Sequence, residues 1–177
     1  MRKGPHSDVL TLPGHNKNIT MPILRYFMWL SLIVWLGGVI FFAAVLAPTV
    51  FTVLPTHQLA GNVVNRSLRI LHWMGIVSAL VFLASSMLYS RFTNGSAHPF
   101  AARHVLLYLM LLLTSISQFG ISPKMAALRS SMGDIDSVSA SDPLRIQFNA
   151  LHAWSTRLEG GVLLLGLAVV YLTSRSS

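Results

Sequence analysis

The sequence predicts an all-α integral membrane protein, built as a four-helix transmembrane bundle. Charged residues make up only 10% of the 177 residues and hydrophobic residues 53%, whereas soluble domains carry about 25% charged residues. The apolar residues gather in four uninterrupted stretches, which is typical of membrane-spanning helices and not of the alternating pattern of barrel strands. This composition excludes a soluble enzyme with a polar surface. The absence of cysteine also excludes disulfides and thiolate-bound metals.

The first stretch covers residues 26–53, which is more than the roughly 20 apolar residues that a helix needs to cross a bilayer. Pro48 lies inside it, and we expect this proline to kink the helix. Residues 1–21 are polar and basic, so we expect a disordered tail before a transmembrane domain over residues 22–175.

Three further spans follow, over residues 70–89, 104–121 and 148–173. Ser122, Pro123 and Lys124 bound the third span. Asp142 followed by Pro143 is the pattern of a helix N-terminus, so we expect a short helical lead-in to the fourth span. Because the connecting segments are short, an up-down topology is expected.

The basic residues favour a cytoplasmic N-terminus and a cytoplasmic C-terminus, in the inner (plasma) membrane. With this orientation the inner side carries more of them than the outer side. They flank the apolar runs, so we expect the lipid bilayer and not nucleic acid as the partner of this basic chain. The sequence leaves open whether the protein forms a homo-oligomer or joins a partner within a membrane complex. The inner set is Arg2, Lys3, Lys17, Arg25, Arg91, Arg103 and Arg175, and the outer set is Arg66, Arg69, Lys124, Arg129 and Arg145.

Two histidines are expected at the same depth of the bundle. His72 lies shortly inside the second span and His152 shortly inside the fourth, and both spans run in the same direction. His104, in the third span, falls at the opposite side of the membrane. Polar side chains inside a bilayer are costly, so His72 and His152 mark a candidate site in the outer half of the bundle.

Other polar residues share this half of the bilayer. His152, Ser155 and Glu159 lie on one face of the fourth span, and Glu159 is the only acid inside any span. An unpaired carboxylate there would be protonated or very costly, so we expect Arg69 or Arg157 to be its partner. Gln118, near the end of the third span, could complete the cluster.

This cluster is compatible with several chemistries. His72 and His152 could ligate the iron of a b-type haem for electron transfer, with an arginine meeting a propionate. They could instead hold copper, with His57, Met74 or Met125 as further ligands, and Glu159 with His152 could relay protons or ions. A purely structural role in orienting the helices is the fourth alternative. No nucleotide-binding, hydrolase or metalloprotease motif is present, so nothing indicates an enzyme.

Four ordered motifs resemble the transmembrane protein 205-like family, formerly a bacterial domain of unknown function. They are the segment from Trp35 to Phe51, the segment Arg69–Trp73, the segment from Gln118 to Arg129 and the segment from Phe148 to Ser155. The resemblance covers residues 22–173. It implies a four-helix integral membrane protein whose biochemical activity is not established for the family. Backbone geometry accounts for the glycines and prolines among the matching positions, which leaves His72, Arg129 and His152 as the candidate site residues.

Overall fold

The computed structural model describes residues 14–96 and 99–175, with side chains from residue 19 onward. Within this part of the chain every regular element is a helix, and two short segments, η1 and η2, are π-helical. The elements are α1 (Gly14–Phe41), η1 (Phe42–Leu46), α2 (Ala47–Val53), α3 (His57–Asn94), α4 (Ala102–Ser115), η2 (Ile116–Ile121), α5 (Ser122–Met132) and α6 (Pro143–Arg175). The predicted disordered tail falls mainly on residues 1–13, which lie outside the described residues. Helix α1 begins at Gly14, within the range assigned to that tail.

These elements form four long rods, because α1, η1 and α2 follow one another without a break, as do α4, η2 and α5. Each rod is long and apolar enough to cross a membrane, which confirms the four predicted spans. The rods extend beyond the apolar cores that define the spans in the sequence, since helical hydrogen bonds continue into polar residues. They cover Ile19–Val53, His57–Asn94, Ala102–Met132 and Pro143–Arg175.

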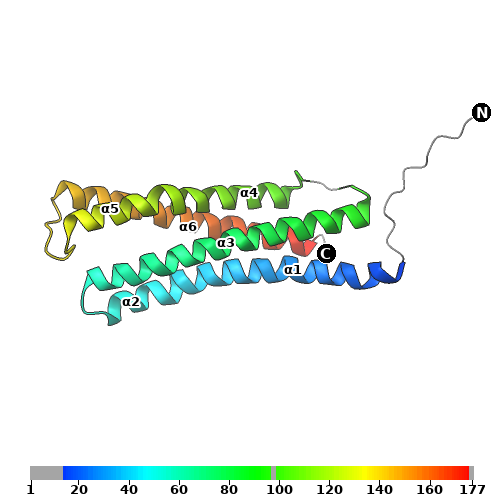
Figure 1. Cartoon of the computed structure of the whole chain (residues 1–177), viewed down its shortest axis with the longest axis horizontal. Coiled ribbons are helices and arrows are strands. Elements are labelled where there is room, and N and C mark those ends of the chain that lie inside the picture. Colours follow the sequence, from blue (N-terminus) through cyan, green and yellow to red (C-terminus); the bar gives the residue numbers. More distant parts are fainter. Residues whose placement is uncertain (1–13, 97–98, 176–177) are drawn as a thin grey trace, which may run out of the picture.

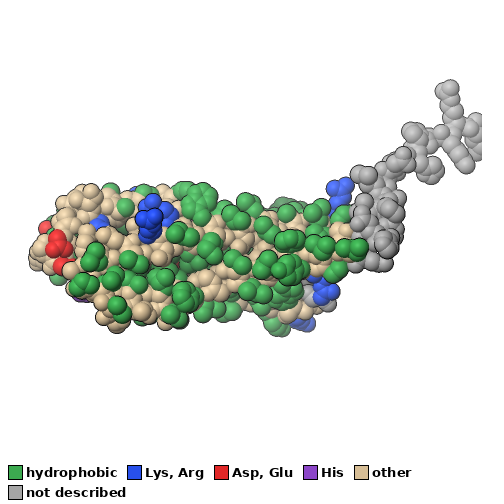
Figure 2. Space-filling view, turned by 60° about the horizontal axis from the view of Figure 1, so that its bottom comes forward, with side chains coloured by type: hydrophobic (Ala, Val, Ile, Leu, Met, Phe, Trp, Pro, Cys, Tyr) green, Lys and Arg blue, Asp and Glu red, His purple; other side chains and the backbone are tan. Residues whose placement is uncertain are grey.

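The four rods lie side by side in an elongated bundle (Figure 1). Helix α1 packs mainly against α3, and α4 mainly against α6. The connections 54–56 and 133–142 lie at one end of the bundle, and the end of α3 and the start of α4 lie at the other with the end of α6. Large apolar side chains cover much of the outer surface, and Figure 2 shows them along the bundle, with acidic side chains gathered at one end. Such a surface suits contact with lipid.

A proline follows each π-helical segment at the second residue of the next helix. The amide of Ala47 donates to the carbonyl of Phe42, and that of Ser122 donates to the carbonyl of Ser117, so each π turn ends one residue before its proline. In an ordinary α-helix a proline ring clashes with the carbonyl four residues earlier, and the wider turn relieves that crowding. The third rod therefore continues past Pro123 to Met132, although the sequence led us to expect its end at residue 121.

The ends of the helices follow their sequence signals. Asp142 Oδ1 accepts a hydrogen bond of 2.8 Å from the amide of Leu144, so Asp142 caps α6, as predicted from the Asp-Pro pair. Thr56 Oγ1 accepts from the amide of Leu59 and caps α3 in the same way. Helix α3 ends at Asn94 and is followed by Gly95, whose φ of 74° is a left-handed conformation that glycine adopts without strain.

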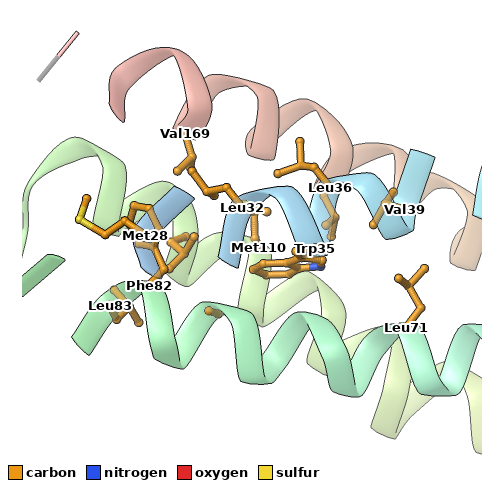
Figure 3. Close-up of a cluster of buried hydrophobic side chains, with 13 residues drawn as sticks. Met28, Leu32, Trp35, Leu36, Val39, Leu71, Phe82, Leu83, Met110 and Val169 are labelled. Carbon is orange, nitrogen blue, oxygen red and sulfur yellow. The ribbon is translucent and has the colours of Figure 1, made fainter. Parts of the chain in front are cut away.

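The hydrophobic core fills the middle of the bundle with side chains from all four rods (Figure 3). Trp35 of α1 is almost fully buried and lies directly against Gly75 of α3, where a Cβ atom would overlap the indole nitrogen. This glycine therefore sets how closely α1 and α3 approach.

On α3 and α4, fully buried apolar residues lie between two hydrogen-bonded polar pairs, and we call these apolar residues the buried layer. Along α3 the layer consists of Ala79 and Phe82, and along α4 it consists of Leu107 and Met110. His104, which hydrogen-bonds Ser86 Oγ at 2.8 Å, lies beyond the layer toward the start of α4. His72 and Gln118 lie on the other side of it.

Candidate functional site

The centre of the site is a hydrogen-bonded cluster of three residues from three rods: His72 of α3, Gln118 of η2 and Glu159 of α6. His72 is 1% exposed. Its Nδ1 atom lies 2.9 Å from Gln118 Oε1, and its Nε2 atom lies 2.5 Å from Glu159 Oε1. Each residue lies near the middle of its rod, so the cluster is deeper in the bundle than the sequence-based placement near the ends of the spans.

The hydrogen bonds determine how many protons the cluster holds when it is neutral. The amide oxygen of Gln118 can only accept, so the Nδ1–H of His72 donates to it. One further proton is then shared between His72 Nε2 and Glu159 Oε1. It is either on the imidazole, giving an imidazolium–carboxylate pair, or on the carboxyl group, giving two neutral partners. In both forms the net charge is zero, which is what a buried site requires.

The π-helical segment η2 helps to position this cluster. Gln118 is in the middle of η2 and is buried, as is the neighbouring Ser117. A π turn changes the direction in which the following side chains point, and such turns are frequent at functional sites. Ser117 Oγ is buried without a hydrogen-bond partner among the described residues.

A cavity of about 500 Å³ adjoins the cluster. It lies between the rods containing α1–α2, α3, α5 and α6, on the side of the cluster toward the connections 54–56 and 133–142. Glu159 lines the cavity, so its carboxyl group is where the cluster meets the cavity. The remaining polar lining includes His57, Asn65, Arg129, Arg145, His152 and Ser155, and the apolar lining includes Phe42, Phe51, Leu68, Phe148 and Leu163.

Arg129 of α5 is held in the cavity wall by three neighbours. Its Nη1 donates to Asn62 Oδ1 at 3.3 Å, and its Cζ lies 5.2 Å from the centroid of the Phe148 ring, a cation–π contact. Gly61 provides the room, since a Cβ there would be 2.6 Å from Nη2. The Nε atom is buried without a hydrogen-bond partner, and no carboxylate of the described chain forms an ion pair with this guanidinium.

His152 does not join His72. It is exposed in the cavity wall, and its ring lies nearly parallel to that of Phe148, with the centroids 6.4 Å apart. Both ring nitrogens of His72 are already engaged by Gln118 and Glu159. The geometry therefore gives no support to a bis-histidine haem site. Across the residues that the structure describes, no three His, Asp or Glu side chains come close enough together to hold a metal ion.

The expectation that Arg69 or Arg157 pairs with Glu159 is wrong, because Glu159 pairs with His72. Arg157 lies two residues before Glu159, and residues so spaced point to different sides of a helix. Its guanidinium is instead 5.3 Å from the centroid of Trp154. Arg69 is exposed on α3, which fits a long charged side chain that keeps its head in a polar environment.

The sequence reasoning missed Arg145 and Gly61 as residues of the cavity, and it named His57 only as a possible further ligand for copper. Arg145 donates to the carbonyl of Ile135, and His57 Nδ1 lies 3.0 Å from Asp136 Oδ1, which holds the connection 133–142 against the start of α3. Gly61 carries no chemical signal of its own. It matters because the guanidinium of Arg129 lies where a Cβ at Gly61 would be. The two residues are 68 positions apart, and no local pattern links them.

The sequence model of one family, described as Domain of unknown function (DUF4149), matches residues 30–134. That range includes His72, Gln118 and Arg129 but ends before the fourth rod, which carries His152 and Glu159. No curated protein and no solved structure matches the chain.

Proposed function

We propose that this chain, which belongs to the DUF4149 family of domains of unknown function, is a multi-pass membrane protein that handles protons through the pair His72–Glu159. One observation carries this proposal: the carboxyl group of Glu159 bonds the buried imidazole and also lines a cavity. An ionisable residue inside a membrane domain is by default a functional candidate, because its burial is costly.

The pair can change its proton count by one in either direction. Adding a proton to the neutral pair gives an imidazolium next to a carboxylic acid, and removing the shared proton leaves a negative charge. The cavity that Glu159 lines also contains the cationic groups of Arg129 and Arg145 and the imidazoles of His57 and His152.

We place the pair in the outer half of an inner-membrane protein, with an up-down topology and both termini in the cytoplasm. The support comes from the basic residues near the end of the bundle where α3 ends and α4 begins: Arg25, Arg91, Arg103 and Arg175. Cytoplasmic ends of spans are enriched in Lys and Arg. The cavity then faces the opposite side, where the three described loop aspartates also lie.

Haem or copper binding has weaker support than proton handling. Iron or copper would have to displace Gln118 or Glu159 from the ring of His72, and His152 lies apart from it. An absorption spectrum of the purified protein separates these alternatives. A Soret band lost in His72→Ala would favour haem over the proton proposal.

Proton handling is tested with the protein in liposomes that contain a pH-sensitive dye, under a potassium diffusion potential. We expect proton movement with the natural chain and its loss in Glu159→Gln, which keeps an amide next to His72 but cannot ionise. Asp134→Asn makes the same chemical change in a connection far from the pair and is the matched control. Infrared difference spectra between acid and alkaline pH should show a carboxylic acid band that Glu159→Gln removes.

Equal proton movement in Glu159→Gln and Asp134→Asn, together with unchanged infrared spectra, would reject the proposal. Circular dichroism and gel filtration show whether each variant keeps its helical fold. If Glu159→Gln does not fold, Glu159→Asp shortens the reach to His72 and provides the second arm of the test.

A further inference from the structure

The cavity beside Glu159 has two chemically different parts. Arg129 and Arg145 contribute cationic groups, and His57 and His152 contribute imidazoles. The other walls are formed mainly by aromatic and aliphatic side chains of α1, η1, α2, α3 and α6. Its volume of about 500 Å³ is within the range of roughly 300–1,000 Å³ that is common for small-molecule sites.

The charge of the polar part favours an anion. Neither arginine forms an ion pair with an acid of the described residues, since those ion pairs are His57–Asp136 and His72–Glu159. The carboxyl group of Glu159 is thus paired with His72, and that of Asp136 with His57. The cavity therefore has two positive groups without a negative partner of their own in the described chain.

Arg129 is held in place, but its hydrogen-bonding capacity is not filled. Its contacts with Phe148 and Gly61 fix the guanidinium, and Asn62 accepts one hydrogen bond from Nη1. A guanidinium has five N–H donors in a planar fork that suits carboxylate and phosphate groups. A positioned and under-used guanidinium at a cavity wall is the feature that an anionic head group needs.

The apolar part of the cavity indicates that the rest of the ligand is apolar. Phe42, Phe51 and Leu68 line it from three elements, and Leu163 lines it from α6. A small inorganic anion alone would leave these walls in contact with water, whereas a hydrocarbon chain would cover them. The two parts together fit a molecule with one anionic group and one apolar chain.

We infer that this cavity binds a single-chain amphipathic anion, a carboxylate or phosphate whose head contacts Arg129 and whose hydrocarbon chain lies against Phe42, Phe51 and Leu68. This inference goes beyond the proposed proton function and does not depend on it. Burial of the ligand's hydrocarbon chain accounts for affinity, and Arg129 accounts for the choice of an anion over a cation.

The test uses the full chain purified in an uncharged maltoside detergent and a fluorescent fatty acid as the bound reporter. Dodecyl phosphate and dodecanoate should displace the reporter. Dodecyltrimethylammonium has the same chain with a cationic head and should not displace it at the same concentration. Inorganic phosphate should displace it at least tenfold more weakly than dodecyl phosphate, which distinguishes an amphiphile from the free anion as the ligand.

Two variants assign the binding to this cavity. Arg129→Gln should weaken dodecyl phosphate binding by tenfold or more, because it removes a charge-assisted hydrogen bond. Arg175→Gln is the matched control, since Arg175 also lies over an aromatic ring of α6, that of Tyr171, but at the other end of the bundle. Leu68→Trp fills the apolar part and should reduce binding even if Arg129→Gln does not fold.

The outcomes are distinct. Displacement by dodecyltrimethylammonium as strong as that by dodecyl phosphate would overturn the inference, as would unchanged binding in Arg129→Gln and Leu68→Trp. Proton movement and reporter displacement are separate readouts on the natural chain: absent proton movement rejects only the proton proposal, and absent displacement by dodecyl phosphate rejects only the ligand inference.

Discussion

The Nε2 atom of His72 lies 2.5 Å from Oε1 of Glu159, although the two residues are 87 positions apart in the chain. Gln118 fixes the other side of the imidazole from a third rod. The pair satisfies two groups that would each be costly to bury alone. It also ties α3 to α6 through a bond that contains an exchangeable proton, so its contribution to stability and its proposed function can be measured separately.

Removing the carboxyl group of Glu159 should destabilise the bundle more than replacing it with an amide. Glu159→Ala leaves Nε2 of the buried His72 without a partner, at a cost of about 1–3 kcal/mol. Glu159→Gln retains a hydrogen-bonding group and should cost less. Thermal unfolding followed by circular dichroism in detergent measures both variants, and equal unfolding temperatures would contradict a structural role for this hydrogen bond.

Replacement by alanine should have opposite effects on stability at Gly75 and at Gly37. A Cβ at Gly75 overlaps the indole nitrogen of Trp35, so Gly75→Ala should destabilise the contact between α1 and α3 by about 1–3 kcal/mol. A Cβ at Gly37 meets no atom within 4 Å. Gly37→Ala should therefore be neutral or stabilising by up to about 1 kcal/mol, through the better helix propensity of alanine. The same unfolding assay ranks the two variants, and the reverse order would contradict the packing described for Trp35.

The cap of α6 should depend on an oxygen and not on a charge. Asp142→Ala removes the acceptor for the amide of Leu144 and should cost about 1 kcal/mol, whereas Asp142→Asn keeps an acceptor and should cost less. Hydrogen exchange at the first turn of α6 should rise in the alanine variant. Unchanged exchange in Asp142→Ala would show that Pro143 alone is enough to start the helix.

Gly61→Ala should reduce ligand binding with little loss of stability. The added Cβ would lie 2.6 Å from Nη2 of Arg129, and the end of a flexible side chain can move away at small cost. The guanidinium would then leave its position over Phe148, so we expect a loss of dodecyl phosphate affinity similar to that of Arg129→Gln. Displacement titrations and unfolding temperatures measure the two effects. Full affinity in Gly61→Ala would show that the position of Arg129 over Phe148 is not needed.

The sequence predicts much of the fold because the relevant signals are local. Four apolar runs identify the four rods, and the pair Asp142 and Pro143 identifies the start of α6. The passage of the third rod through Pro123 was not predictable, because a π turn leaves no composition signal and proline normally ends a helix.

The site was only partly predictable, for a different reason. Polarity inside an apolar run singles out His72, Gln118 and Glu159, but which of them touch depends on how the helices rotate against one another. His152 was placed beside His72 by depth alone, and the structure puts it in the cavity wall instead. The transmembrane protein 205-like assignment and the roles of Arg129 and His152 stay predictions.

The buried layer of Ala79, Phe82, Leu107 and Met110 has an electrical consequence if the chain crosses a bilayer as proposed. A membrane potential falls mainly across the part of a protein that excludes water, and it amounts to about 2.3 kcal/mol per unit charge for 100 mV across the whole membrane. A proton that reaches Glu159 through the cavity has crossed only part of the field, and the layer is the part that it still has to pass to reach the far side. Proton uptake by the pair should therefore depend weakly on voltage, whereas passage beyond the layer toward His104 and Ser86 should depend on voltage more strongly.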